Sequence, residues 1–124
     1  MSSWPFSSNL APGSQIAQVR PVVTTAVTAW VPTLRTEITS IKICNTSASA
    51  RVFSVFHDDD GGTFSEATAL YWGRTAGIGE TISIDASSPY AGITVSKNGR
   101  IGVRSDLTSG LTFTFYGAVQ MAGG

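Results

Sequence analysis

The chain has 124 residues, which is enough for one domain and too few for two. Eight Lys and Arg residues balance eight Asp and Glu residues, and charged side chains make up only 13% of the chain. Because no Lys/Arg cluster is present to bind phosphates, we predict no nucleic-acid partner. The apolar fraction of 42% excludes a charged disordered tail. The scarcity of Leu, Glu and Lys argues against a coiled coil or a helical bundle.

Metal and membrane chemistry find little support in the composition. A single Cys and a single His exclude an internal disulfide and a multi-Cys zinc site. The first residues lack the basic and apolar regions of a secretory peptide, and residues 21–32 are too few and too rich in Thr to span a bilayer. We therefore predict no metal, no cofactor, no membrane partner and no classical export.

Residues 1–14 are rich in Ser, Pro and Gly and show no periodicity, which predicts an N-terminal arm before a domain over 15–124. A solvated linker has little use for Trp4, Phe6 and Leu10. We expect these side chains to dock on this domain or on a neighbour. The alternative is a partly disordered start with stray aromatic residues.

From Gln15 onward, Val, Ile, Thr and aromatic residues alternate with turn residues, and no window shows a 3.6-residue period. This pattern predicts strands and less than one turn of α-helix anywhere. Pro21 lies between the first two strands, which allows them to form one interrupted edge strand. The predicted strands cover residues 15–20, 22–31, 36–44, 51–57, 68–72, 80–85, 92–97, 100–105 and 111–119.

Three connections carry turn chemistry. Asn98-Gly99 between two apolar runs predicts a two-residue hairpin with a type I′ turn. The small polar residues 45–50 suit a short hairpin loop, and the acidic, Gly-rich residues 58–63 predict a further turn.

Eight or nine short strands in about 110 residues predict an all-β fold, a single antiparallel β-sandwich of jelly-roll type. Residues 51–57 are apolar on both faces, which indicates a central strand that is covered on two sides. In 111–116, one face carries Leu and Phe and the other carries Thr and Tyr. The predicted inner layer comprises Ile41, Ile43, Phe53, Val55, Ile82, Ile84, Val103, Phe113 and Phe115, or their register partners.

The run Asp58-Asp59-Asp60-Gly61 looks most like a chemical site, because calcium prefers several carboxylates. The run does not match an EF-hand loop, and only Glu66 follows within reach. The alternative is an exposed turn in which the Asp side chains accept hydrogen bonds from nearby backbone N–H groups. His57 and Asp58 are adjacent in a strand and point to opposite faces, so we predict no catalytic pair.

Cys44 ends a predicted strand and is interpreted as a small hydrophobe rather than a nucleophile. Asn45-Thr46-Ser47 fits the glycosylation sequon, which we treat as chance. Tyr71 and Trp72, together with Trp30, could stack on sugars or bases, or could instead be core or subunit contacts. We predict no catalytic, cofactor-binding or metal-binding residues.

Residues 36–47, TEITSIKICNTS, and the aromatic-rich continuation 48–61, ASARVFSVFHDDDG, resemble small structural proteins of tailed bacteriophages. Residues 68–72, TALYW, and the segments 101–105 and 111–117 fit the same likeness, which covers roughly 20–117. The resembling motifs are strands and turns rather than catalytic signatures. The resemblance implies a virion protein of the capsid surface, a head fibre or a tail appendage.

The resemblance therefore implies a capsid decoration, or cement, protein that binds and stabilises the major capsid protein shell. It would lie on the capsid surface of a virion assembled in the bacterial host cytoplasm, as a homo-oligomer with a trimer favoured. Low charge and several large aromatic residues fit such an assembly. The arm, residues 1–14, is expected to attach the protein to the shell. The alternatives are a receptor- or glycan-binding module of a head or tail fibre and, third, a small enzyme.

Overall fold

The computed structural model describes residues 14–32, 34–85 and 93–119, and over these ranges the chain is almost entirely β. Its only helical element there is the short 3₁₀ turn η1, Glu66–Thr68. The described residues therefore confirm the predicted all-β class. The strands are β1 (Ser14–Val19), β2 (Val27–Trp30), β3 (Thr36–Asn45), β4 (Arg51–Asp58), β5 (Ala69–Ala76), β6 (Thr81–Asp85), β7 (Ile93–Val95), β8 (Arg100–Ser105) and β9 (Leu111–Val119).

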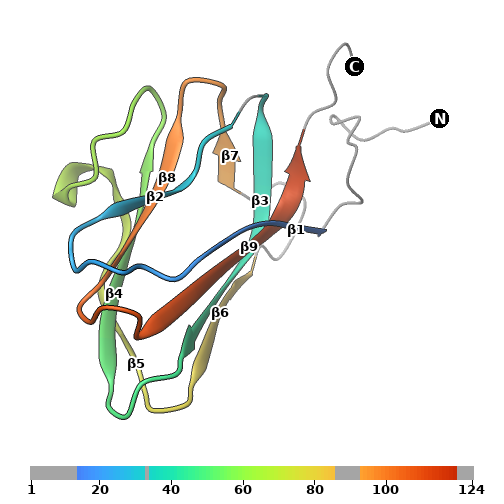
Figure 1. Cartoon of the computed structure of the whole chain (residues 1–124). Helices are drawn as coiled ribbons and strands as arrows, with labels where there is room; N and C mark the ends of the chain where they lie inside the picture. The colour runs from blue at the N-terminus through green and yellow to red at the C-terminus, as the bar shows by residue number, and fades with distance from the viewer. Residues whose placement is uncertain (1–13, 33, 86–92, 120–124) are drawn as a thin grey trace.

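Two antiparallel sheets pack against each other to form a sandwich (Figure 1). Sheet A has the order β1-β9-β3-β6, and β7 also pairs with β3; sheet B has the order β2-β8-β4-β5. Because β6 and β7 pair with successive parts of β3, they act as one interrupted strand. The antiparallel pairs are then nested: β1 with β9, β2 with β8, β3 with β6 and β7, and β4 with β5. This nesting is the strand order of a jelly roll.

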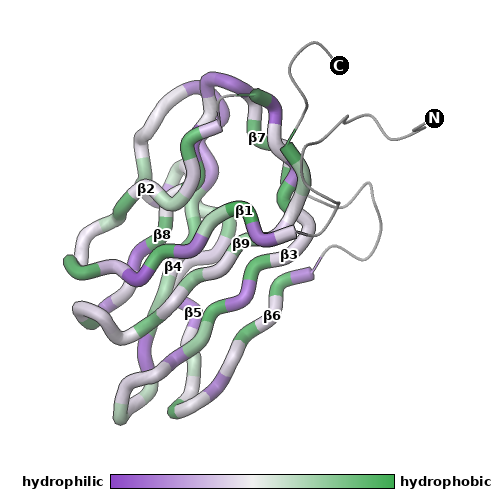
Figure 2. The backbone as a smooth tube through the Cα atoms, turned by 45° about the vertical axis from the view of Figure 1, so that its right-hand side comes forward, coloured by the Kyte–Doolittle hydropathy of each residue, from purple (hydrophilic) through white to green (hydrophobic). Residues whose placement is uncertain are grey.

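The hydrophobic core lies between the sheets and follows from the two-residue alternation along each strand. Figure 2 shows hydrophobic and hydrophilic residues alternating along β3. All nine residues predicted for the inner layer belong to this core or pack against it, with Ile82 and Ile84 only partly buried because β6 is an edge strand. The buried cluster comprises Ile38, Ile41, Ile43, Phe53, Val55, Ala76, Val95, Ile101, Val103, Leu111, Phe113 and Phe115.

The prediction of one interrupted edge strand around Pro21 was wrong. β1 belongs to sheet A and β2 to sheet B, so the chain crosses between the sheets at Pro21, and β2 covers only Val27–Trp30 of the predicted 22–31. Proline lacks the N–H that a sheet ladder needs, which favours a crossing at this point. The carbonyl of Pro21 accepts a hydrogen bond from the N–H of Ser109 at 2.8 Å, which ties this crossing to the β8–β9 turn.

The predicted type I′ hairpin at Asn98-Gly99 was also wrong. The N–H of Gly99 donates to the carbonyl of Ser96 at 2.9 Å, so Lys97 and Asn98 are the central residues of the turn. Neither Asn98 nor Gly99 has the positive φ that a type I′ turn requires of its two central residues. The flanking strands β7 and β8 lie in different sheets, so the turn joins the sheets instead of closing a hairpin.

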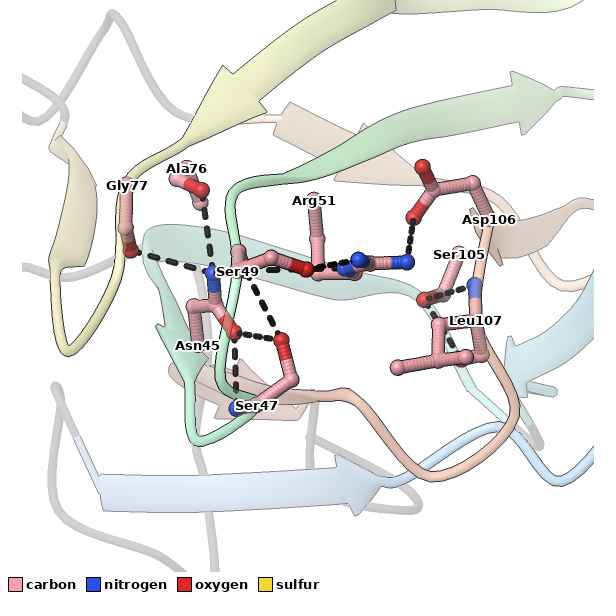
Figure 3. Close-up of polar contacts among 9 residues, drawn as sticks. All are labelled: Asn45, Ser47, Ser49, Arg51, Ala76, Gly77, Ser105, Asp106 and Leu107. Atoms are coloured by element: carbon pink, nitrogen blue, oxygen red, sulfur yellow. Dashed lines mark hydrogen bonds and ion pairs between the residues drawn. The ribbon is translucent and has the colours of Figure 1, made fainter.

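The predicted hairpin loop 45–50 is likewise a crossing, because β3 lies in sheet A and β4 in sheet B. Asn45 organises it and is only 1% exposed. Its side-chain nitrogen lies 2.9–3.0 Å from the carbonyl oxygens of Ser49, Ala76 and Gly77 (Figure 3). Its side-chain oxygen accepts hydrogen bonds from the N–H and the hydroxyl of Ser47. One buried amide therefore fixes two neighbouring crossings at this end of the sandwich.

Candidate interaction surface

The acidic run forms a turn that its own carboxylate stabilises. Oδ1 of Asp58 accepts from the N–H of Asp60 at 3.2 Å, and Oδ2 accepts from the N–H of Thr63 at 2.8 Å. The hydrogen bond from Thr63 is the main cause that lowers the pKa of Asp58, whereas the hydrogen bond and charge of Asp58 raise the pKa of Asp60. Within the described ranges, no three His, Cys, Asp or Glu residues group as metal ligands. The arrangement matches the exposed-turn interpretation.

His57 approaches Asp59 rather than Asp58, with 3.4 Å between Nε2 and Oδ1. This approach lacks hydrogen-bond geometry, and Nε2 has no hydrogen-bond partner among the described residues.

Cys44 is half-buried in sheet A, in register between Thr112 of β9 and Thr81 of β6. Its neighbours across the sheet are thus small hydroxyl residues. The sequon that begins at Asn45 is not accessible in the folded domain. The side-chain nitrogen of Asn45, which would carry a glycan, is buried and hydrogen-bonded. The folded domain offers no access to that atom.

The three aromatic residues considered as a stacking platform are not brought together. Trp30 on β2 packs against the core and donates Nε1–H to Oγ1 of Thr36 at 3.1 Å. Tyr71 on β5 also packs against the core, and β2 and β5 are opposite edges of sheet B. The structure thus supports the core interpretation for Trp30 and Tyr71. Trp72 alone is strongly exposed, at 47%.

Trp72 belongs to a second aromatic layer on the outer face of sheet B. Phe56 is fully buried although its neighbour Val55 points into the sandwich core. The ring of Phe64 lies 5.9 Å from that of Phe56, and the ring of Trp72 lies 6.1 Å away in an edge-to-face arrangement. These contacts confirm that β4 is covered on both faces, as its apolar pattern predicted.

The ring of Phe64 packs directly against a glycine, Gly102. A Cβ at Gly102 of β8 would lie 2.6 Å from the Phe64 ring, closer than any real contact allows. The absence of a side chain at Gly102 therefore lets the ring lie directly on the strand. A glycine inside an apolar strand is a recognised signal of such a close approach, and this signal was available in the sequence.

Arg104 adds a cation to this layer. Its guanidinium carbon lies 4.6 Å from the ring centroid of Trp72 and 5.9 Å from that of Phe56. Nη2 of Arg104 donates to Oγ of Ser54 at 3.4 Å. Among the described residues, no carboxylate pairs with Arg104. Within this part of the chain, aromatic rings and a hydroxyl hold the cation, and no carboxylate does.

Trp72 lies in a β-bulge of β5. The pairing of β4 and β5 shifts register between Phe53 and Val55, which places two residues of β5, Trp72 and Gly73, opposite Ser54. Gly73 has a φ of 63°, in the left-handed region that favours glycine. Its N–H donates to Oγ of Ser54 at 3.1 Å.

Strand alternation places two exposed aliphatic residues on the same face: Leu70, two residues before Trp72 on β5, at 43%, and Val52, four residues before Phe56 on β4, at 40%. We define the Trp72 patch by the residues Val52, Phe56, Phe64, Leu70, Trp72 and Arg104. Its members come from three strands and a loop without any periodic spacing. Of these residues, only Trp72 was singled out from the sequence.

The outer face of sheet A has a different chemistry. Nζ of Lys42 lies 3.0 Å from Oγ of Ser83 and 3.3 Å from Oδ1 of Asp85. The hydroxyl of Ser40 donates to the same carboxylate oxygen at 2.5 Å and is the main cause that lowers the pKa of Asp85. This face is a network of cross-strand polar contacts.

No protein-family model matches the chain, and no curated protein or solved structure is similar to it. Over the described ranges, the structure contains no helix of the length and apolarity that a membrane span needs. The predicted anchors Trp4, Phe6 and Leu10 lie outside the described residues.

Proposed function

We propose that this chain is a structural protein of a bacteriophage virion, specifically a capsid decoration protein that binds and stabilises the shell of the major capsid protein. The observation that carries the proposal is the Trp72 patch, a contact surface exposed on a small sandwich with fixed loops. Binding surfaces are rich in Trp and Arg, and this patch contains one of each, Trp72 and Arg104. The sequence resemblance to phage structural proteins supplies the virion context, since the fold alone does not define a function.

Fixed geometry supports this function, because a decoration protein must match a rigid shell. At the end of the sandwich shown in Figure 3, Nη1 of Arg51 lies 3.9 Å from Oδ1 of Asp106, whose N–H donates to the carbonyl of Val52 at 3.1 Å. Together with the Asn45 network, these contacts tie the loops to the sheets. Loops held in this way lose little entropy on binding.

The proposal includes a homo-oligomer, with a trimer favoured, and an attachment role for residues 1–14. The trimer rests on the family likeness, because decoration proteins often occupy threefold positions on shells. A symmetric oligomer multiplies weak contacts through avidity. The arm contains no charged side chain, so attachment through Trp4, Phe6 and Leu10 would depend little on salt.

The test is the number of copies in purified, DNA-filled heads, measured by quantitative mass spectrometry and located in an electron-microscopy map. A decoration protein is present in numbers comparable to the major capsid protein and lies on the outer shell. Absence from the heads, or a location inside the shell, would overturn the proposal.

The second candidate is a receptor- or glycan-binding module of a head or tail fibre, favoured by the exposed indole of Trp72. A fibre module is present in few copies at a vertex or on the tail. It also binds host surface glycans, which a glycan array detects. Copy number and location therefore separate the two candidates in one measurement.

A further inference from the structure

We propose that the Trp72 patch is the docking surface for a segment of the partner protein that carries an acidic side chain among apolar ones. This inference rests on the proposed function, because the partner would be the capsid shell protein. It adds the face of the domain that binds and the chemistry that the face recognises.

The first step is that the patch remains open. Trp72, Leu70 and Val52 are between 40% and 47% exposed, although Phe56, against which Trp72 packs, is fully covered. Exposed large hydrophobic residues grouped on one face typically mark an interaction site. The aromatic layer below them holds Trp72 in one orientation, so little side-chain entropy is lost when a partner covers it.

The second step is charge. Arg104 pairs with no carboxylate among the described residues. Its guanidinium lies over Trp72. The neighbouring carboxylates Asp58, at the end of β4, and Glu66, in η1, form no ion pair with Arg104. A carboxylate in the partner would therefore meet uncompensated positive charge.

The third step excludes other occupants. A second copy that docked by the same face would present a further Arg104 and no carboxylate of the patch, so it would leave the charge of Arg104 unpaired. The chain's own residues 1–13 contain no Asp or Glu and cannot supply the carboxylate. A neutral sugar could stack on the exposed part of the Trp72 indole, but it would offer no carboxylate to the Arg104 guanidinium. An acidic and apolar polypeptide segment fits all of these features.

The experiment measures binding of the full chain to purified heads from which the protein has been stripped. Arg104→Glu and Leu70→Ser change the patch, and Lys97→Glu and Val23→Ser make the same kinds of change at exposed sites elsewhere. We expect at least tenfold weaker binding for the two patch variants and unchanged binding for the two controls. Because Leu70 and Val23 are 43% and 44% exposed, the apolar pair is matched in exposure. Equal binding by all four variants would overturn the docking proposal while leaving the proposed function in place.

A second experiment requires no phage particles. Synthetic peptides that combine Glu with Leu and Phe are compared with a neutral set and with polysialic acid, by calorimetry at low and high salt. Binding of the acidic peptides that Arg104→Glu abolishes and salt weakens supports the docking surface, even if the protein fails to bind heads. Binding of polysialic acid alone would overturn it in favour of a glycan. An oligomer that Leu70→Ser dissociates would overturn it in favour of a second copy.

Discussion

The two sheets share one hydrophobic core, but their outer faces differ: that of sheet A is polar, and that of sheet B carries a second aromatic layer. Sheet A places Ser40, Lys42, Ser83 and Asp85 outward and joins them by hydrogen bonds and one ion pair. Sheet B places Phe56 outward and covers it with two further rings and a guanidinium. The alternation of a strand decides which residues leave the core. It does not decide whether they face water or build another apolar layer.

The largest expected effect separates the two faces by stability. Phe56→Ala should cost about 3–5 kcal/mol of unfolding free energy, because it empties a fully buried aromatic site. Tyr116→Ala on the outer face of sheet A removes a ring of similar size from a half-buried position and should cost less than half as much. Chemical denaturation measures both. Equal costs would mean that the layer on sheet B is not packed as a core.

An intermediate loss of stability tests the packing of the Phe64 ring against Gly102. Gly102→Ala should cost about 1–3 kcal/mol, because the new Cβ would displace the ring that it meets at 2.6 Å. The same substitution in a Phe64→Ala background has no ring to displace and should cost much less. A double-mutant cycle by thermal or chemical unfolding gives the coupling between the two positions. A coupling near zero would contradict the close approach of Phe64 to β8.

The smallest effect belongs to sheet A and depends on pH. The hydrogen bond from Ser40, together with Lys42, lowers the pKa of Asp85 in the folded state. A lowered folded pKa stabilises the protein above the ordinary value of 3.8, and this stabilisation is lost as the pH falls through the folded pKa. Asp85→Asn should therefore unfold at a slightly lower temperature than the wild type at pH 7.

The difference between the two proteins should vanish in strong acid. Glu66→Gln makes the same charge change at a carboxylate without an ion pair among the described residues, and serves as the control for net charge. Melting curves between pH 2 and pH 7 measure the difference in melting temperature between the wild type and each variant. A gap between wild type and Asp85→Asn that persists at pH 2 would show that the carboxylate charge is not what stabilises this edge.

Local sequence pattern located all nine strands of the described ranges and the inner layer, because burial alternates with a period of two wherever a strand lies on the core. It gave the wrong bounds for β2, predicted as 22–31 and observed as Val27–Trp30, and for β5, predicted as 68–72 and observed as Ala69–Ala76. It failed at Asn98-Gly99 and at 45–50 for one shared reason. A turn signal reports the local backbone but not whether the next strand stays in the same sheet, and in this fold both connections change sheets. The Trp72 patch was missed similarly, because Phe56, Gly102 and Arg104 meet only through β4–β8 pairing.

The nested strand order also determines which strands can pair early in folding and how fast the chain folds. Only β4 and β5 pair with a strand that follows directly in the chain, so every other ladder must close a long loop first. Folding is therefore expected to begin near β4 and β5 and to take milliseconds to seconds. In sheet A, β9 lies between β1 and β3, yet it leaves the ribosome after every other described strand. Until then one edge of β3 lacks its ladder partner, and this unpaired edge can pair with a strand of another chain.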